Sequence, residues 1–197
     1  MRLVLQQIAA VTASFKPNDH EDIVLERYSL LQRVLHWFIA IMVFGMLTSG
    51  MALMVFGDES VGSLVKVHMS FGVLVFITML IRVALRVLMP TPASPLTGVE
   101  QRIGNTIHLL LYVLLIGLPI SGWLATSAIG ETVQFFNMTL PALMTATEST
   151  KAFGETVFEL HGLGGIAVLL LVLVHTAAAI KHWLVLKDGM MNRISLP

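Results

Sequence analysis

The sequence contains no cysteine, and only 12% of its 197 residues are charged. The lack of cysteine excludes disulfide bonds, thiolate-ligated iron–sulfur clusters and covalent haem attachment through Cys-x-x-Cys-His. A soluble globular domain carries about 25% charged residues, so the shortage of charge argues against a soluble protein. The formal net charge is +0, which leaves no electrostatic case for nucleic acid as a partner.

Long apolar runs dominate what is present, because 56% of the residues are hydrophobic and the mean hydropathy is +0.83. Each of four runs is near or above the ~20 residues that a helix needs to cross a bilayer: 34–56, 64–88, 107–129 and 160–185. The sequence therefore predicts an all-α fold, an integral membrane four-helix bundle surrounded by lipid. We expect one membrane domain over 28–189, flanked by an N-terminal tail (1–27) and a C-terminal tail (190–197).

The breaks between the runs are rich in Gly, Pro, Ser and Thr, which favour turns. The longest break, 130–159, contains Pro141 and several Thr and Ser residues. We expect it to be partly ordered against the membrane face.

Lysine and arginine are unevenly distributed between the two ends of the predicted helices. If the N-terminus is inside, only Lys66 and Lys151 lie outside, and ten lie inside: Arg2, Lys16, Arg27, Arg33, Arg82, Arg86, Arg102, Lys181, Lys187 and Arg193. Positive residues collect on the cytoplasmic side of membrane proteins. Both termini are therefore predicted to be cytoplasmic, and the outer loops are net acidic.

Four histidines lie within the apolar runs, where an ionisable side chain is costly and indicates function. His161 and His175 share one run, and their spacing returns them to the same helix face, offset by about 40° and about 21 Å apart along the axis. Alternating helix directions place His36 and His175 toward the inner surface, and His68 and His161 toward the outer surface. Two such pairs can fill both axial positions of two haem irons.

A haem iron with two histidine ligands has no open position, so it would transfer electrons rather than bind a small ligand. Other interpretations remain open at this point. Any single membrane histidine can simply bond a neighbouring helix, and the bundle can be a structural or transport protein without a cofactor. A zinc site is disfavoured because its three or four ligands would converge at one depth.

Other polar residues gather at the inner end of the predicted bundle. Arg82 and Arg86 lie one turn apart and can pair with haem propionates, since arginine binds carboxylates with two hydrogen bonds. Anchoring by the positive-inside rule explains them equally well.

Three further residues are candidates for a quinone site at that end: His108, Lys181 and His182. A histidine there can donate a hydrogen bond or carry a proton to a quinone headgroup, although an interfacial position alone also suits these side chains. His182 is a rival to His175 as inner ligand, which we prefer because it lies deeper. His20, in the polar tail, is expected to have no specific role.

Ordered motifs carry a resemblance to a known family: Arg27-Tyr28-Ser29, His36-Trp37, His68-Met69-Ser70-Phe71-Gly72, Leu118-Pro119-Ile120-Ser121-Gly122-Trp123-Leu124 with Tyr112 upstream, His161, His175 and His182-Trp183. The chain resembles the bacterial cytochromes b561, which are four-helix di-haem b proteins of the inner membrane. The resemblance implies two non-covalent haem b groups with His36, His68, His161 and His175 as ligands.

The resemblance also implies electron transfer with quinone. One class of members oxidises superoxide at the outer surface and reduces ubiquinone, and another serves as the membrane cytochrome subunit that links a partner dehydrogenase or hydrogenase to quinone. Superoxide:quinone oxidoreduction is the leading expectation, although an acidic outer face repels an anion at long range. Met69, Gly162 and Trp183 depart from the residues often found in the family (Lys, Glu and His), and no catalytic residue is assigned.

Overall fold

The computed structural model describes residues 26–57 and 62–196. Most of the predicted N-terminal tail lies outside this range. The same holds for three residues named in the sequence analysis: Arg2, Lys16 and His20.

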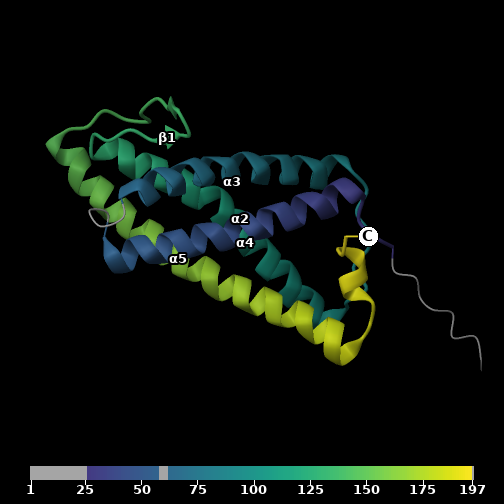
Figure 1. Cartoon of the computed structure of the whole chain (residues 1–197). Helices are drawn as coiled ribbons and strands as arrows, with labels where there is room; N and C mark the ends of the chain where they lie inside the picture. Colours follow the sequence, from purple (N-terminus) through teal and green to yellow (C-terminus); the bar gives the residue numbers. More distant parts are fainter. Residues whose placement is uncertain (1–25, 58–61, 197) are drawn as a thin grey trace, which may run out of the picture.

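Four long helices make up most of the described residues (Figure 1): α2 (Leu30–Phe56), α3 (Gly62–Leu88), α4 (Gly98–Ala128) and α5 (Glu148–Ile180), the last continuing as a π-helical segment, η1 (Lys181–Leu186). All four are long and apolar enough to cross a membrane. Each predicted run falls within one of them, except that Ile129 lies just beyond α4 as its C-cap. The prediction of an all-α membrane four-helix bundle is confirmed.

Local sequence signals define where two of these helices begin. Ser29 caps α2 and Thr147 caps α5, and in each case the residue three positions later bonds back to complete a capping box. The cap at Thr147 starts α5 well before the predicted start at residue 160. Residues 148–159 contain more polar than apolar side chains and so look like a loop by hydropathy, yet they form the first turns of α5.

The segment between α4 and α5 holds a short antiparallel hairpin of β1 (Gln134–Phe135) and β2 (Met138–Thr139). The buried Ser70 on α3 attaches it to the bundle, because its hydroxyl accepts the Phe136 N–H at 2.8 Å and donates to the Gln134 carbonyl at 3.2 Å. We call this end of the molecule the hairpin end.

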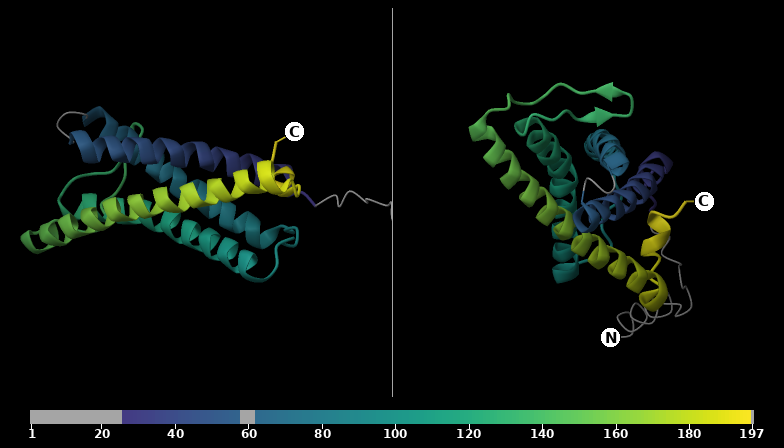
Figure 2. Two further views of the ribbon diagram at one scale, coloured as in Figure 1. Left: turned by 90° about the horizontal axis from the view of Figure 1, so that it is seen from below. Right: turned by 60° about the vertical axis from the view of Figure 1, so that its left-hand side comes forward.

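The opposite end is closed by residues 190–195, which we call the latch; they include the short 3-10 helix η2 (Met190–Arg193). The buried Arg193 donates to the carbonyls of Glu26 (3.1 Å) and Ala93 (2.7 Å), and Trp37 donates to the Ile194 carbonyl at 3.0 Å. Figure 2 shows this yellow segment beside the purple start of α2. Residues 190–195 of the predicted C-terminal tail therefore pack on the bundle.

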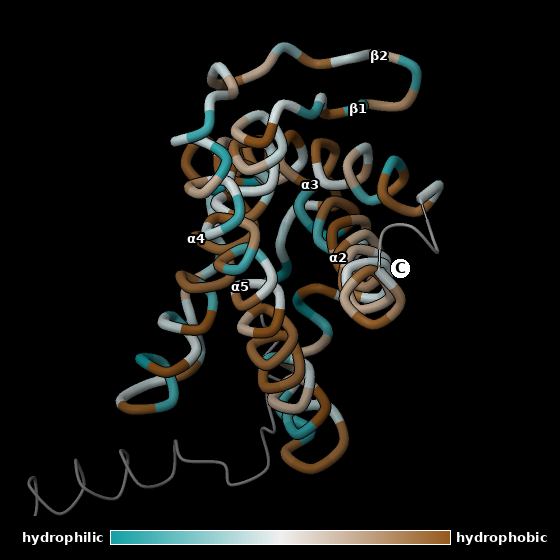
Figure 3. The backbone as a smooth tube through the Cα atoms, turned by 90° about the vertical axis from the view of Figure 1, so that its left-hand side faces the viewer, coloured by the Kyte–Doolittle hydropathy of each residue, from teal (hydrophilic) through white to brown (hydrophobic). Residues whose placement is uncertain are grey.

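The buried core is small, and the outside of the bundle is apolar. Figure 3 shows hydrophobic residues along much of each helix, and side chains such as Phe44 (73% exposed) face outward, as lipid-facing residues do. The core cluster joins α2, α3 and α5: Ile39, Met42, Val43, Val75, Met79 and Val168. Val168 lies midway between His161 and His175, so this apolar layer separates two polar levels of the bundle.

Candidate functional site

One pair of facing histidines lies toward the hairpin end. The rings of His68 on α3 and His161 on α5 have their centres 6.2 Å apart, at 76° to each other. The Nδ1 of His161 is 3.0 Å from the Leu118 carbonyl, which can only accept, so Nδ1 carries the proton and Nε2 keeps its lone pair. The Ser49 hydroxyl donates to the Met46 carbonyl, which leaves its oxygen to accept from His68 Nδ1 at 2.8 Å.

A second pair lies toward the latch end. The ring centres of His36 on α2 and His175 on α5 are 6.3 Å apart, at 66°. A third ring, that of His108 on α4, is centred 5.3 Å from His175. Arg82 donates to the Tyr112 hydroxyl at 3.1 Å and reaches His36 Nδ1 at 3.3 Å. Because a guanidinium has no acceptor, Nδ1 of His36 is the acceptor in this contact.

The separations within both pairs suit a shared metal ion. Imidazole nitrogens bind transition metals at about 2.0–2.1 Å, so two rings on opposite sides of one ion have their centres about 6.2–6.5 Å apart. Both observed separations fall within this range. Within the described residues, no group of three His or acidic side chains could hold a metal ion, so the donor sets are pairs. The donor chemistry and spacing therefore fit a haem iron, which the two histidines of each pair would hold.

The other predicted inner residues are spread over the latch end. Arg86 donates to the Tyr28 hydroxyl at 3.4 Å. Lys181 lies 3.7 Å from a carboxylate oxygen of Glu100, and both side chains are more than half exposed. Of the candidate residues at this end, the structure places His108 and Arg82 against the histidine pair, whereas Arg86 and Lys181 contact other partners.

His182 contacts Asp188 rather than the ring pair. Its Nδ1 bonds the Asp188 carboxylate, and the Met190 N–H donates to the same carboxylate at 3.0 Å. Partial burial opposes ionisation of Asp188, but these hydrogen bonds outweigh it and hold the pKa of Asp188 below its ordinary value. The ring opposite His36 belongs to His175, which was the preferred inner residue.

Sequence reasoning missed how the hairpin-end pair is held in place. Ser49 and Gly50 lie against His68, and Ser121 and Gly122 lie against His161. The sequence does contain a signal, because the dipeptide Ser-Gly occurs once in α2 and once in α4, both inside apolar runs. The sequence alone does not show which ring each dipeptide contacts, since this depends on how the helices pack.

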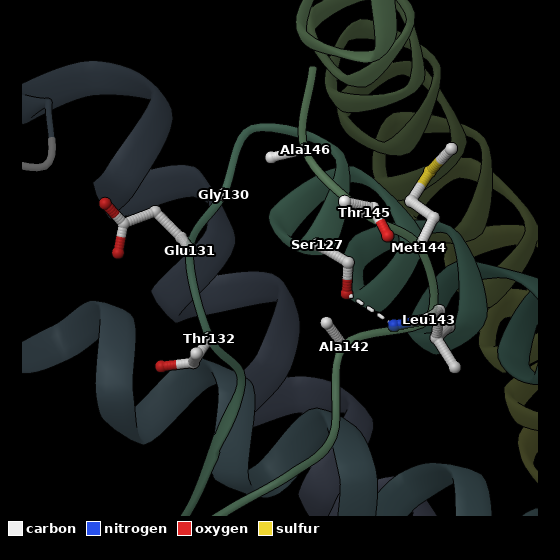
Figure 4. Close-up of a pocket in the computed structure, with 9 residues that line it drawn as sticks. All are labelled: Ser127, Gly130, Glu131, Thr132, Ala142, Leu143, Met144, Thr145 and Ala146. Atoms are coloured by element: carbon white, nitrogen blue, oxygen red, sulfur yellow. Dashed lines mark hydrogen bonds between the residues drawn. The ribbon is translucent and has the colours of Figure 1, made fainter.

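A cavity of about 530 Å³ lies at the hairpin end, between the end of α4 and the loop that follows the hairpin. Figure 4 shows the hydrogen bond across it, from the Leu143 N–H to Ser127 Oγ, 3.0 Å long. Its lining is neutral except for Glu131 and includes no histidine. The cavity is therefore distinct from both ring pairs.

Four membrane-length helices with facing histidines between them form the architecture of a membrane cytochrome of the b type, in which histidines hold a non-covalent haem. A family model described as prokaryotic cytochrome b561 matches residues 27–195. The chain belongs to this family.

Curated relatives agree over most of the chain. Cytochrome b561 homolog 2 of Escherichia coli (strain K12) is 32% identical over 177 residues, which is 86% of this chain and 91% of the relative. The probable superoxide oxidase CybB of Yersinia pestis is 27% identical over 175 residues (86% and 96%), and cytochrome b561 homolog 1 of E. coli is 23% identical over 176 residues (86% and 97%). The family assigns the chain to membrane electron transfer with a b-type haem and a quinone-type partner.

Proposed function

We propose that the chain binds two haem b groups, one at each histidine pair, and carries electrons across the bilayer between a donor and quinone. The observation that carries this proposal is the two ring separations, 6.2 and 6.3 Å, at two levels of one bundle. When bound, each haem supplies a one-electron carrier. His161 and His175, on one helix, fix the distance between the two levels.

At the latch end, ligation through Nε2 of His36 requires the proton to be on Nδ1. Arg82, which now donates to Nδ1, has to release this contact. A haem propionate offers the guanidinium a better acceptor, because charge-assisted bonds to carboxylates are roughly twice as strong as neutral ones. Arg82 and Arg86 are therefore proposed as propionate partners.

The latch end is proposed to face the cytoplasm. Of the ten Lys and Arg residues in the described part of the chain, eight belong to this end, and the hairpin end has Lys66 and Lys151. This distribution follows the positive-inside rule. In this proposal the chain is a multi-pass protein of the bacterial inner membrane, and the tails 1–27 and 190–197 on either side of the 28–189 domain are cytoplasmic.

Quinone is proposed to bind at the latch end. Its reduction takes two electrons and two protons to give the quinol, so a proton donor has to lie near the electron carrier. His108 meets this requirement because its ring contacts that of His175. His182, bonded to Asp188, and Lys181 lie on the same end and can pass protons from water.

Superoxide is the leading donor in this proposal, at the hairpin end: two superoxide ions each give one electron and leave as dioxygen, while one quinone takes both electrons. The name of the Yersinia pestis relative, a probable superoxide oxidase, supports this choice. Whether the chain is a complete enzyme depends on this donor.

One observation favours a second candidate, a membrane cytochrome subunit that takes electrons from a partner dehydrogenase or hydrogenase. Acidic residues outnumber Lys66 and Lys151 at the hairpin end: Glu131, Glu148, Glu155 and Glu159. Such a surface repels an anion at long range. Isolated protein that reduces quinone with superoxide supports the first candidate, and protein that needs an added partner supports the second.

The decisive experiment is a visible spectrum of the purified protein, oxidised and reduced, with a pyridine haemochrome assay. We expect a b-type spectrum and two haems per chain. One haem per chain, or none, contradicts the proposal. Replacing His68 or His161 with Ala should remove one haem, and replacing His36 or His175 the other. If His182→Ala loses a haem and His175→Ala keeps both, the inner ligand is His182 and not His175.

The quinone site is tested separately. His108→Ala or His182→Ala should lower the quinone-reductase rate and leave both haem spectra unchanged. Unaltered rates in these variants, with a fall in Lys66→Ala, would move the quinone site to the hairpin end.

A further inference from the structure

Two Ser-Gly dipeptides hold the hairpin-end histidines in the same way. Ser49 Oγ lies 2.8 Å from Nδ1 of His68, and Ser121 Oγ lies 3.1 Å from Nδ1 of His161. The two dipeptides come from α2 and α4, and the two histidines from α3 and α5, so all four helices take part. Each serine is followed by a glycine that also faces the ring.

Each serine is placed to leave the proton on Nδ1 of its histidine, and at His161 the Leu118 carbonyl requires the proton there. Each hydroxyl donates to a carbonyl of its own helix, Ser49 to Met46 at 3.1 Å and Ser121 to Leu118 at 2.8 Å. Each serine oxygen is therefore left to accept the Nδ1–H of its histidine. Both rings keep the Nε2 lone pair for a metal, which is the arrangement that hydrogen-bond partners of metal-bound histidines normally enforce.

The glycines set how closely each ring approaches its neighbouring helix. A Cβ at Gly50 would lie 3.3 Å from Cε1 of His68, and one at Gly122 would lie 3.1 Å from Cε1 of His161. Both distances are tighter than ordinary contact. A larger residue would press each ring away from the serine that precedes the glycine.

The latch-end pair has a different environment. His36 Nδ1 faces the guanidinium of Arg82 rather than a hydroxyl oxygen, and on turning to a propionate, as proposed above, Arg82 keeps its positive charge at this level of the bundle. Hydrogen bonds that accept from Nδ1–H make an imidazole a stronger electron donor to its metal, which favours oxidised iron. A nearby positive charge favours the reduced state.

From this difference we infer that Ser49 and Ser121 are positioning residues that lower the reduction potential of the hairpin-end haem below that of the latch-end haem. The inference rests on the two haems proposed above. It makes electron flow from the hairpin end to the latch end energetically downhill. The difference between the two reduction potentials follows from the protein around the ligands, because all four proposed ligands are histidines.

The test is a redox titration of purified, haem-loaded protein, followed by its visible spectrum, in the wild type and in Ser49→Ala and Ser121→Ala. We expect two components, of which only the lower-potential one shifts upward in the variants. The shift should be smaller in Ser121→Ala, because Leu118 still accepts from His161 Nδ1 at 3.0 Å. Ser49→Thr keeps a hydroxyl, so its potential should equal that of the wild type. If Ser49→Ala loses a haem, Ser49→Thr should retain it.

Ser127→Ala is the matched control: it removes a hydroxyl from the same end of α4, but one that bonds the Leu143 amide. Its potentials should equal those of the wild type. No shift in either variant, or a shift of the higher-potential component alone, would overturn the inference. A wild type without two haems would instead refute the proposed function, so the two failures are distinguishable.

Discussion

The contacts of individual ring nitrogens separate the histidines by chemistry, although all four lie within apolar helices. His161 donates to a carbonyl and His68 to a hydroxyl, whereas His36 accepts from Arg82. These contacts decide which nitrogen is free to bind a metal. Position in the sequence does not show which nitrogen is free, because that depends on residues contributed by neighbouring helices.

Replacing a glycine with alanine should lower haem content only where the glycine contacts a proposed ligand. Gly122→Ala places a methyl group 3.1 Å from His161 Cε1, whereas a Cβ at Gly162 meets nothing within 4 Å. We expect Gly122→Ala to lower the occupancy of one haem, and Gly162→Ala to keep both and to gain up to about 1 kcal/mol of helix stability. Haem content per chain measures the difference, and equal content in the two variants would refute it.

Depth along the helices and helix phase predicted which histidines lie opposite each other, because both properties can be read from each helix separately. His182, the rival inner ligand, lies in the π-helical segment η1 and contacts Asp188. The proximity of His108 to His175 depends on how α4 packs against α5, which sequence periodicity does not encode.

At the scale of elements, a side chain of α3 bonds the backbone of the hairpin segment. Ser70→Ala removes the acceptor of the Phe136 N–H, and losing one hydrogen bond costs about 1 kcal/mol. We expect hydrogen exchange at Phe136 to accelerate by about fivefold to tenfold. Ser94→Ala, at the exposed turn near the latch end, is the control and should leave this amide unchanged. Unaltered exchange at Phe136 in Ser70→Ala would show that other contacts hold the hairpin.

Hydropathy found the membrane part of each helix and missed what lies outside it. The start of α5 is fixed by Thr147 and Thr150, which form a capping box with Glu148 in the first turn. Such a signal is local and can be read from the sequence. The hairpin could not be predicted in this way, because two-residue strands have no periodicity and their attachment to Ser70 is a long-range contact.

For the whole molecule, orientation is the property that the functional proposal needs. A reporter that fluoresces only in the cytoplasm, fused after residue 197, should be fluorescent, because eight described Lys and Arg residues lie at the latch end. A reporter active only outside the cytoplasm, fused at the same point, should be inactive. The reverse pattern would invert the bundle and exchange the donor and quinone sides.

The latch also has a consequence for the order of events during biosynthesis. Tyr28 donates its backbone N–H to the Arg193 carbonyl, and Arg33 donates to the Ser195 carbonyl, so the start of α2 is fastened by residues that are synthesised after all four described helices. These helices can be in the bilayer before the contacts exist. We therefore expect the latch to close on α2 only after the four helices have been made.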